Sequence, residues 1–82
     1  MLTHTRARVP VDDTEFGDMN GFFAVGSVST AITCTIWTQA GDDRTVVIPA
    51  GFDESAGFIP LAVKKMVTGN QTELNKIVVL GV

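Results

Sequence analysis

Hydrophobic and polar residues alternate most clearly between Ala31 and Thr38. A repeat of two is typical of a half-buried β-strand, so this segment is predicted to be a strand with one face in a core. The face expected to be buried carries Ile32, Cys34 and Ile36, and the opposite face carries Thr33, Thr35 and Trp37. Trp37 therefore needs cover from another strand or from another subunit.

Four more segments have strand-like patterns separated by turn signals rich in glycine, asparagine or aspartate. The expected strands are Phe22–Val28 (interrupted at Gly26), Thr45–Pro49, Phe58–Val67 and Asn75–Val82. The expected turns and loops are Met19–Gly21, Gln39–Arg44, Ala50–Gly57 and Gly69–Thr72. The spacing of about 8–12 residues between turns favours a small sandwich or barrel.

Two of these segments have features of their own. Phe58–Val67 is compatible with a helix that starts at Pro60, but its alternation and its β-favouring residues favour a strand. Ile77–Leu80 is apolar on both faces, which predicts burial on both faces, inside a sandwich or at a subunit contact.

The first part of the chain, Met1–Asp18, shows little periodicity. Pro10 fixes φ and removes a backbone donor, so this part is expected to be an extended arm or an edge strand. We therefore expect an all-β protein: a small antiparallel β-sandwich or barrel of five to six strands over residues 19–82, preceded by an extended N-terminal arm over residues 1–18.

Composition suggests how so short a chain is stabilised. With 82 residues it forms one domain with a small core, and such domains are often supported by disulfides, metals or oligomerisation. Cys34 and His4 are the only residues of their kinds, which excludes an internal disulfide and argues against a zinc site. Hydrophobic residues make up 45% of the chain and charged ones 18%, so assembly with other chains is the expected solution.

Charge and targeting patterns exclude several classes of function. The net charge is −3 and no basic face is apparent, so no direct contact with nucleic acid is expected. No segment has the length and apolar character of a membrane-spanning helix, and the N-terminus lacks the apolar run of a signal peptide. The chain is expected to be made and kept in the cytoplasm until it is assembled.

Candidate catalytic groups are sparse. Cys34 and His4 are the available nucleophile and base, but Cys34 lies on the face assigned to the core, where a thiol is usually inert. Paired acids occur at Asp12–Asp13, Asp42–Asp43 and Asp53–Glu54, each in an expected loop and without EF-hand spacing. No phosphate-binding glycine motif is present. We expect a protein that is not an enzyme and that holds no cofactor or metal.

Residues suited to protein contacts are more numerous. Aromatic residues concentrate in the centres of interfaces, and the adjacent Lys64 and Lys65 suit an acidic patch on a partner or protect a sheet edge. The interface candidates are Arg6, Arg8, Val9, Phe22, Phe23, Trp37, Phe52, Phe58, Lys64 and Lys65.

The chain resembles a group of small structural proteins of tailed bacteriophages from about Arg6 to its end. The segments that carry the resemblance are Ala7–Val9, Asp13–Thr14, Phe22–Gly26, Ile48–Gly51, Ile59–Val67, Thr68–Thr72 and Ile77–Leu80. Two features depart from the group: Phe52–Gly57 looks like an insertion, and Gly81–Val82 stand where the group usually has an aromatic residue.

The resemblance implies a role in the virus particle. Proteins of this kind include capsid decoration (cement) proteins, which bind the major capsid protein on the outer shell and are often homotrimers. On physical grounds, a short β domain with an extended arm gains stability when the arm adds a strand to a neighbouring copy. Two other functions stay open: a head–tail connector, neck or tail component, and a small regulator that binds a host protein.

Overall fold

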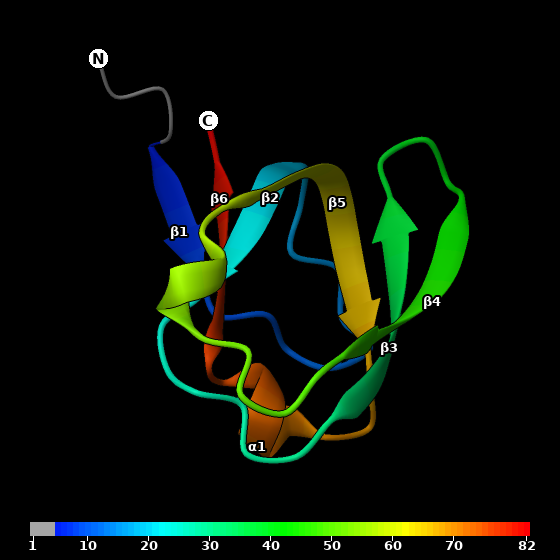
Figure 1. Cartoon of the computed structure of the whole chain (residues 1–82). Coiled ribbons are helices and arrows are strands. Elements are labelled where there is room, and N and C mark those ends of the chain that lie inside the picture. Colours follow the sequence, from blue (N-terminus) through cyan, green and yellow to red (C-terminus); the bar gives the residue numbers. More distant parts are fainter. Residues whose placement is uncertain (1–4) are drawn as a thin grey trace.

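A computed structural model describes residues 5–82 and confirms that the chain is nearly all β (Figure 1). The described residues form six strands, one short α-helix and one 3-10 helix. In chain order these are β1 (Arg6–Arg8), β2 (Met19–Ala24), β3 (Ile32–Thr38), β4 (Asp43–Ile48), η1 (Glu54–Ala56), β5 (Ile59–Val67), α1 (Gln71–Leu74) and β6 (Ile77–Gly81).

The strands form one antiparallel sheet in the order β1-β6-β2-β5-β3-β4. The sheet is not closed, because β1 and β4 each have one neighbour, and these two edges lie on opposite flanks of the molecule (Figure 1). The finer expectation of a sandwich or a barrel is therefore not established by this topology.

β5 joins the two halves of the sheet. Its first residues pair with β2, and its last residues pair with β3, where Met66 lies opposite Ile36. The strand expected here is confirmed, and the alternative of a helix beginning at Pro60 is excluded. Pro60 is accommodated opposite Gly21, beside an irregularity in the β2–β5 register, which is a position that suits proline in a sheet.

The core lies against the face of the sheet that carries Ile32, Cys34 and Ile36, as the alternation predicts. Burial of apolar side chains stabilises the fold by about 25 cal/mol per Å² removed from water. The other buried hydrophobic residues are Phe16, Met19, Phe22, Ala24, Val28, Ile48, Val63, Met66, Leu74, Ile77 and Val79.

β2 begins earlier than expected, because the predicted turn at Met19–Gly21 is part of the strand. Gly21 is needed for close packing here rather than for a turn: a Cβ atom on it would meet the carbonyl oxygen of Ile59 and lie 2.9 Å from Cε1 of Phe58. A glycine inside a strand often marks such a close approach.

The turn predicted at Gly69–Thr72 contains the start of α1 instead. The Asn70 side chain accepts a hydrogen bond from the Glu73 N–H at 3.2 Å, which caps the helix, and Leu74 is fully buried. Asparagine is a strong helix N-cap, and tertiary packing such as that of Leu74 supplies most of the stability of so short a helix.

The described part of the N-terminal segment belongs to the same folded unit. β1 pairs with β6, while Pro10 and Phe16 are buried. The backbone N–H groups of Asp13 and Phe16 donate to the carbonyl oxygens of Met66 and Lys64, at 3.1 and 3.0 Å. From Pro10 onward this segment packs against β5 and α1 of the same chain.

β6 is buried on one face only. Ile77 and Val79 have no exposed surface, whereas Val78 and Leu80 on the opposite face are half-buried. Burial on both faces is thus not seen within a single chain, and the alternative of a subunit contact stays a prediction. The outer face of β6 remains accessible for a contact.

Candidate functional site

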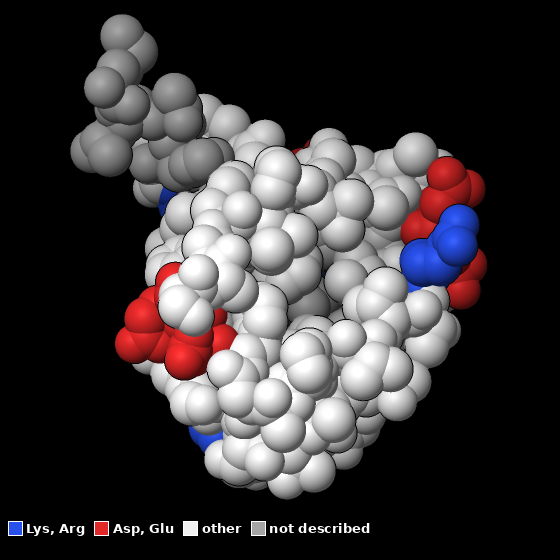
Figure 2. All heavy atoms as spheres, in the orientation of Figure 1, with Lys and Arg blue, Asp and Glu red and all other residues white. Residues whose placement is uncertain are grey.

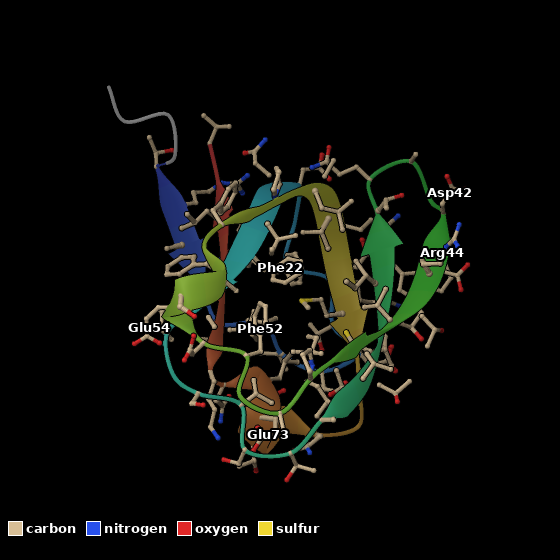
Figure 3. All side chains as sticks on the ribbon, in the orientation of Figure 1. Phe22, Asp42, Arg44, Phe52, Glu54 and Glu73 are labelled. Carbon is tan, nitrogen blue, oxygen red and sulfur yellow. The ribbon has the colours of Figure 1, made fainter. Side chains whose placement is uncertain are left out.

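A broad region without charged side chains covers one side of the molecule (Figure 2). It lies between acidic residues around Glu54 on one flank and the charged residues Asp42 and Arg44 on the other (Figure 3). An apolar centre with a polar rim is the usual arrangement of a protein–protein contact surface. We call this region the uncharged face.

A groove of about 280 Å³ opens the hydrophobic core on this face. Phe22 and Phe52 both point toward its centre, Phe22 from β2 and Phe52 from the loop before η1 (Figure 3). The other residues that line it are Ile36, Val46, Val47, Ile48, Pro49, Ile59 and Leu61. No charged side chain lines the groove, so it fits an apolar group.

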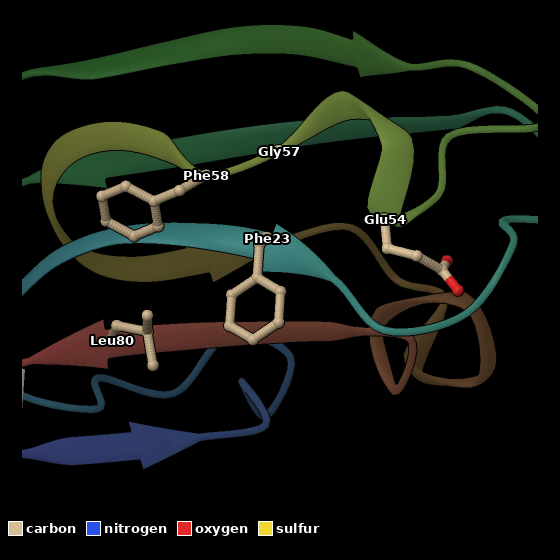
Figure 4. Close-up of a pocket in the computed structure, with 5 residues that line it drawn as sticks. All are labelled: Phe23, Glu54, Gly57, Phe58 and Leu80. Atoms are coloured by element: carbon tan, nitrogen blue, oxygen red, sulfur yellow. The ribbon is translucent and has the colours of Figure 1, made fainter.

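A second, shallower pocket of about 430 Å³ lies beyond η1. Phe23, Phe58 and Leu80 form its apolar surface, and Gly57 and Glu54 lie at its border (Figure 4). Phe23 and Leu80 come from the outer face of β2 and β6, and Phe58 is 38% exposed. Phe52 and Phe58 thus lie on either side of η1, one in the groove and one in the pocket.

The edge strand β4 borders the groove. Its side chains are exposed from Asp43 to Val47, and Val47 is 63% exposed. Arg44, Val46 and Ile48 pair with buried residues of β3 and lie on the inner face of the sheet. Asp43, Thr45 and Val47 lie on the outer face, where the hydroxyls of Thr45 and Thr35 are 3.1 Å apart.

The aromatic candidates separate into three places. Phe22 and Phe52 meet at the groove, although Phe22 is mainly a core residue, and Phe23 and Phe58 meet at the pocket. Trp37 is elsewhere, on the outer face of β3, where Lys65 Nζ lies 5.1 Å from its ring centroid. The cover that Trp37 needs is supplied at least in part by β5 of the same chain.

Of the basic candidates, Lys65 and Arg6 have partners within the chain, and Arg8 lies at the far edge of the sheet. Lys65 pairs with Asp13 at 3.4 Å. Arg6 donates from Nε to the carbonyl oxygen of Val82 at 2.8 Å and from an η nitrogen to that of Asp18 at 2.7 Å. Arg8 and Val9 are exposed at the β1 edge, and Lys64 is half-buried in β5.

The described side chains suited to covalent or acid–base chemistry are either buried or hydrogen-bonded within the fold. Burial raises the pKa of the Cys34 thiol to about 11, so the thiolate is scarce near neutral pH. Backbone N–H groups of Thr68 and Gly69 hold the pKa of Asp12 below its ordinary value, and the hydroxyl and N–H of Ser55 do the same for Asp53. His4 lies outside the described residues.

Glu73 is the one buried acid among the core residues described here. Burial raises its pKa, but hydrogen bonds from the Ser29 N–H and from Lys76 lower it by more, so the net shift is downward. Ser29 N lies 2.7 Å from one carboxylate oxygen, and Lys76 Nζ lies 3.2 Å from the other. Glu73 therefore ties α1 to the loop before β3 as an ionised group. Within residues 5–82, no group of three or more His, Cys, Asp or Glu is placed to hold a metal ion.

Three residues that line the groove, Val46, Val47 and Ile48, are not among the interface candidates that the sequence predicts, because the sequence indicates only a return strand there. A signal was present, because Val46 to Ile48 are apolar on both faces, as in Ile77–Leu80. Ile59 and Leu61 alternate as predicted but line the groove rather than a closed core.

The chain matches no protein-family model, no curated protein and no solved structure, so these comparisons show neither its family nor its function. The one α-helix in the described part of the chain is far too short to cross a membrane.

Proposed function

We propose that the chain is a structural protein of a tailed bacteriophage, a decoration protein that binds the outer surface of the major capsid protein shell and stabilises it. Its place would be the surface of the virus particle, after synthesis in the host cytoplasm. The observation that carries this proposal is the uncharged face, with an apolar groove and a neighbouring pocket between charged flanks. The resemblance of Ile59–Val67 and the flanking segments to phage structural proteins supplies the biological context.

The uncharged face suits this role physically. A protein that stabilises a shell needs broad, shape-matched apolar contact with its neighbours and no reaction site. Exposed Val46 and Phe58 are side chains that a monomer would leave in water at a cost, and that a contact surface would bury.

The chemistry of the described residues supports binding over catalysis. The free thiol of Cys34 is buried with a raised pKa, and Asp12 and Asp53 have backbone partners. Each of these groups has a structural explanation. We therefore propose a protein without enzymatic activity, whose partners are the major capsid protein and other copies of itself.

Binding to purified shells tests the proposal. The wild-type chain should cosediment with empty capsid shells of its phage, and Phe58→Ser should reduce the bound fraction, because the substitution removes the apolar wall of the pocket. Val25→Ser is the matched control, since Val25 is 50% exposed and lines neither hollow. No binding of the wild type, or equal loss in both variants, would count against the uncharged face as the contact surface.

A further inference from the structure

The two edges of the sheet differ in how they are protected against pairing with another chain. Edge strands expose unpaired backbone groups, and proteins commonly block them with charged side chains. β1 carries Arg6 and Arg8 in a strand of three residues. β4 has charges at one end, Asp43 and Arg44, and then continues as Thr45–Ile48 without any charge.

Whether two edges can pair depends on which side chains would lie opposite each other on the same face of the joined sheet. Arg8 pairs with Val79, whose side chain is buried, so Arg8 lies on the inner face, and Arg6 lies on the same face two residues earlier. Arg44 pairs with Ile36 and is also on the inner face. Side chains directly opposite each other in neighbouring strands share a face, and like charges there repel.

Pairing that involves β1 is disfavoured by this arrangement. Two β1 strands centred on Ala7 would place Arg6 opposite Arg8 twice. If β1 joined β4 with inner faces aligned, one register would place Arg8 opposite Arg44. Another register would place both arginines of β1 opposite the apolar residues Val46 and Ile48.

Pairing of two β4 strands avoids these conflicts. Antiparallel pairing about a twofold axis at Val46 places Val46 opposite its own counterpart, Thr45 opposite Val47 and Arg44 opposite Ile48. No two like charges then face each other. β-Branched residues opposite one another are favourable cross-strand pairs.

We propose that two copies of the chain associate through β4, edge to edge and antiparallel, into one continuous sheet with a twofold axis at Val46. This inference rests on the self-association part of the proposed function and gives it twofold symmetry, in place of the threefold symmetry that the resemblance implies. It does not depend on binding to a capsid. Since Val46 lines the groove, the joint brings the grooves of the two copies onto one shared inner face.

Analytical ultracentrifugation of the purified full-length chain tests this contact. The wild type should sediment as two copies at micromolar concentration and dissociate on dilution. Val46→Lys and Val46→Glu should each raise the dissociation constant by about tenfold or more, because each sets two like charges across the axis. An equimolar mixture of the two variants should regain the dimer, since opposite charges then meet, and this recovery also shows that both variants are folded.

Val25→Lys serves as the control, because Val25 is exposed outside β4 and the groove, and it should leave the dimer unchanged. A wild type that is monomeric or trimeric, or a mixture that does not recover, would overturn the β4 contact. Shell binding by a wild type that is monomeric in solution would leave the decoration role standing while this inference fails. A dimer that does not bind shells would support the β4 contact and contradict the decoration role.

Discussion

The carboxylate of Asp12 accepts a hydrogen bond from the backbone N–H of Thr68, with Oδ1 and N 2.6 Å apart. The same oxygen lies 3.0 Å from the N of Gly69. The Asp12 N–H in turn donates to Oε1 of Gln71 at 2.6 Å. Through Asp12, the start of the chain is tied to the turn between β5 and α1, more than fifty positions away in the sequence.

Removal of this carboxylate should destabilise the fold. Asp12→Ala is expected to lower the free energy of unfolding by about 1–2 kcal/mol, because two backbone donors lose a charged acceptor. Urea denaturation measures the effect. Asp18→Ala is the matched control, since no hydrogen bond or ion pair is seen for its side chain among the described residues. Equal midpoints for the two variants would contradict the structural role of Asp12.

Stability should decrease in acid. The folded-state pKa values of Asp12, Asp53 and Glu73 are lowered from ordinary values of 3.8, 3.8 and 4.5. In this range the unfolded chain binds more protons than the folded chain, so these carboxylates contribute stability that is complete above pH 4.5 and is lost as the pH falls through the folded values.

Urea midpoints measured from pH 7 down to pH 3 should show this loss. Glu73→Gln should give a shallower decline than the wild type, because one of the shifted groups is absent. A midpoint that rises on acidification would contradict the assignment of these carboxylates as ionised hydrogen-bond acceptors.

Gly21 and Gly26 should respond differently to the same added methyl group. At Gly21 a Cβ atom would meet the Ile59 backbone and the Phe58 ring, whereas at Gly26 the nearest contact is Lys76 Cγ at 3.6 Å. Gly21→Ala is expected to lower the free energy of unfolding by about 1–3 kcal/mol through overpacking. Gly26→Ala should change it by much less. Thermal denaturation of both variants would detect the difference, and similar melting temperatures would argue against the close packing of β2 on Phe58.

Cys34 should be unreactive in the folded chain. Its side chain has no exposed surface and its pKa is about 11, so a disulfide reagent at pH 8 finds little accessible thiolate. Labelling should be slow in buffer and complete within the mixing time in denaturant. Rapid labelling of the folded chain would place Cys34 at the surface and reopen the question of a reactive thiol.

The alternating pattern in Ala31–Thr38 was sufficient to predict β3 and its buried face, because alternation reports directly which side chains are buried. Alternation also predicts β5, whereas β4 and β6 are predicted from β-favouring apolar residues and from the turns that flank them. α1 was not predictable in this way, because four residues are too few for helical periodicity, and only the capping residue Asn70 signals it. The integration of Pro10 and Phe16 depends on contacts with β5 and α1 that no local pattern encodes.

The candidate site was predicted in part. Aromatic residues were the right kind of residue to consider, and Phe52 and Phe58 do border the two hollows. Val46 and Val47 were missed because their exposure depends on β4 being an edge, and strand order is set by long-range pairing rather than by local sequence. The same dependence on topology placed Trp37 beside Lys65 instead of on the uncharged face.

The number of copies per particle tests the proposed role in the virus particle. Quantitative mass spectrometry of purified, DNA-filled particles should find this chain in a fixed ratio near one copy per major capsid protein, or one assembly per vertex between capsomers. About six to twelve copies would indicate a neck or tail ring instead of decoration, as expected for a structure built on a sixfold or twelvefold axis. Absence from purified particles would contradict the structural role altogether and favour a regulator that acts inside the host cell.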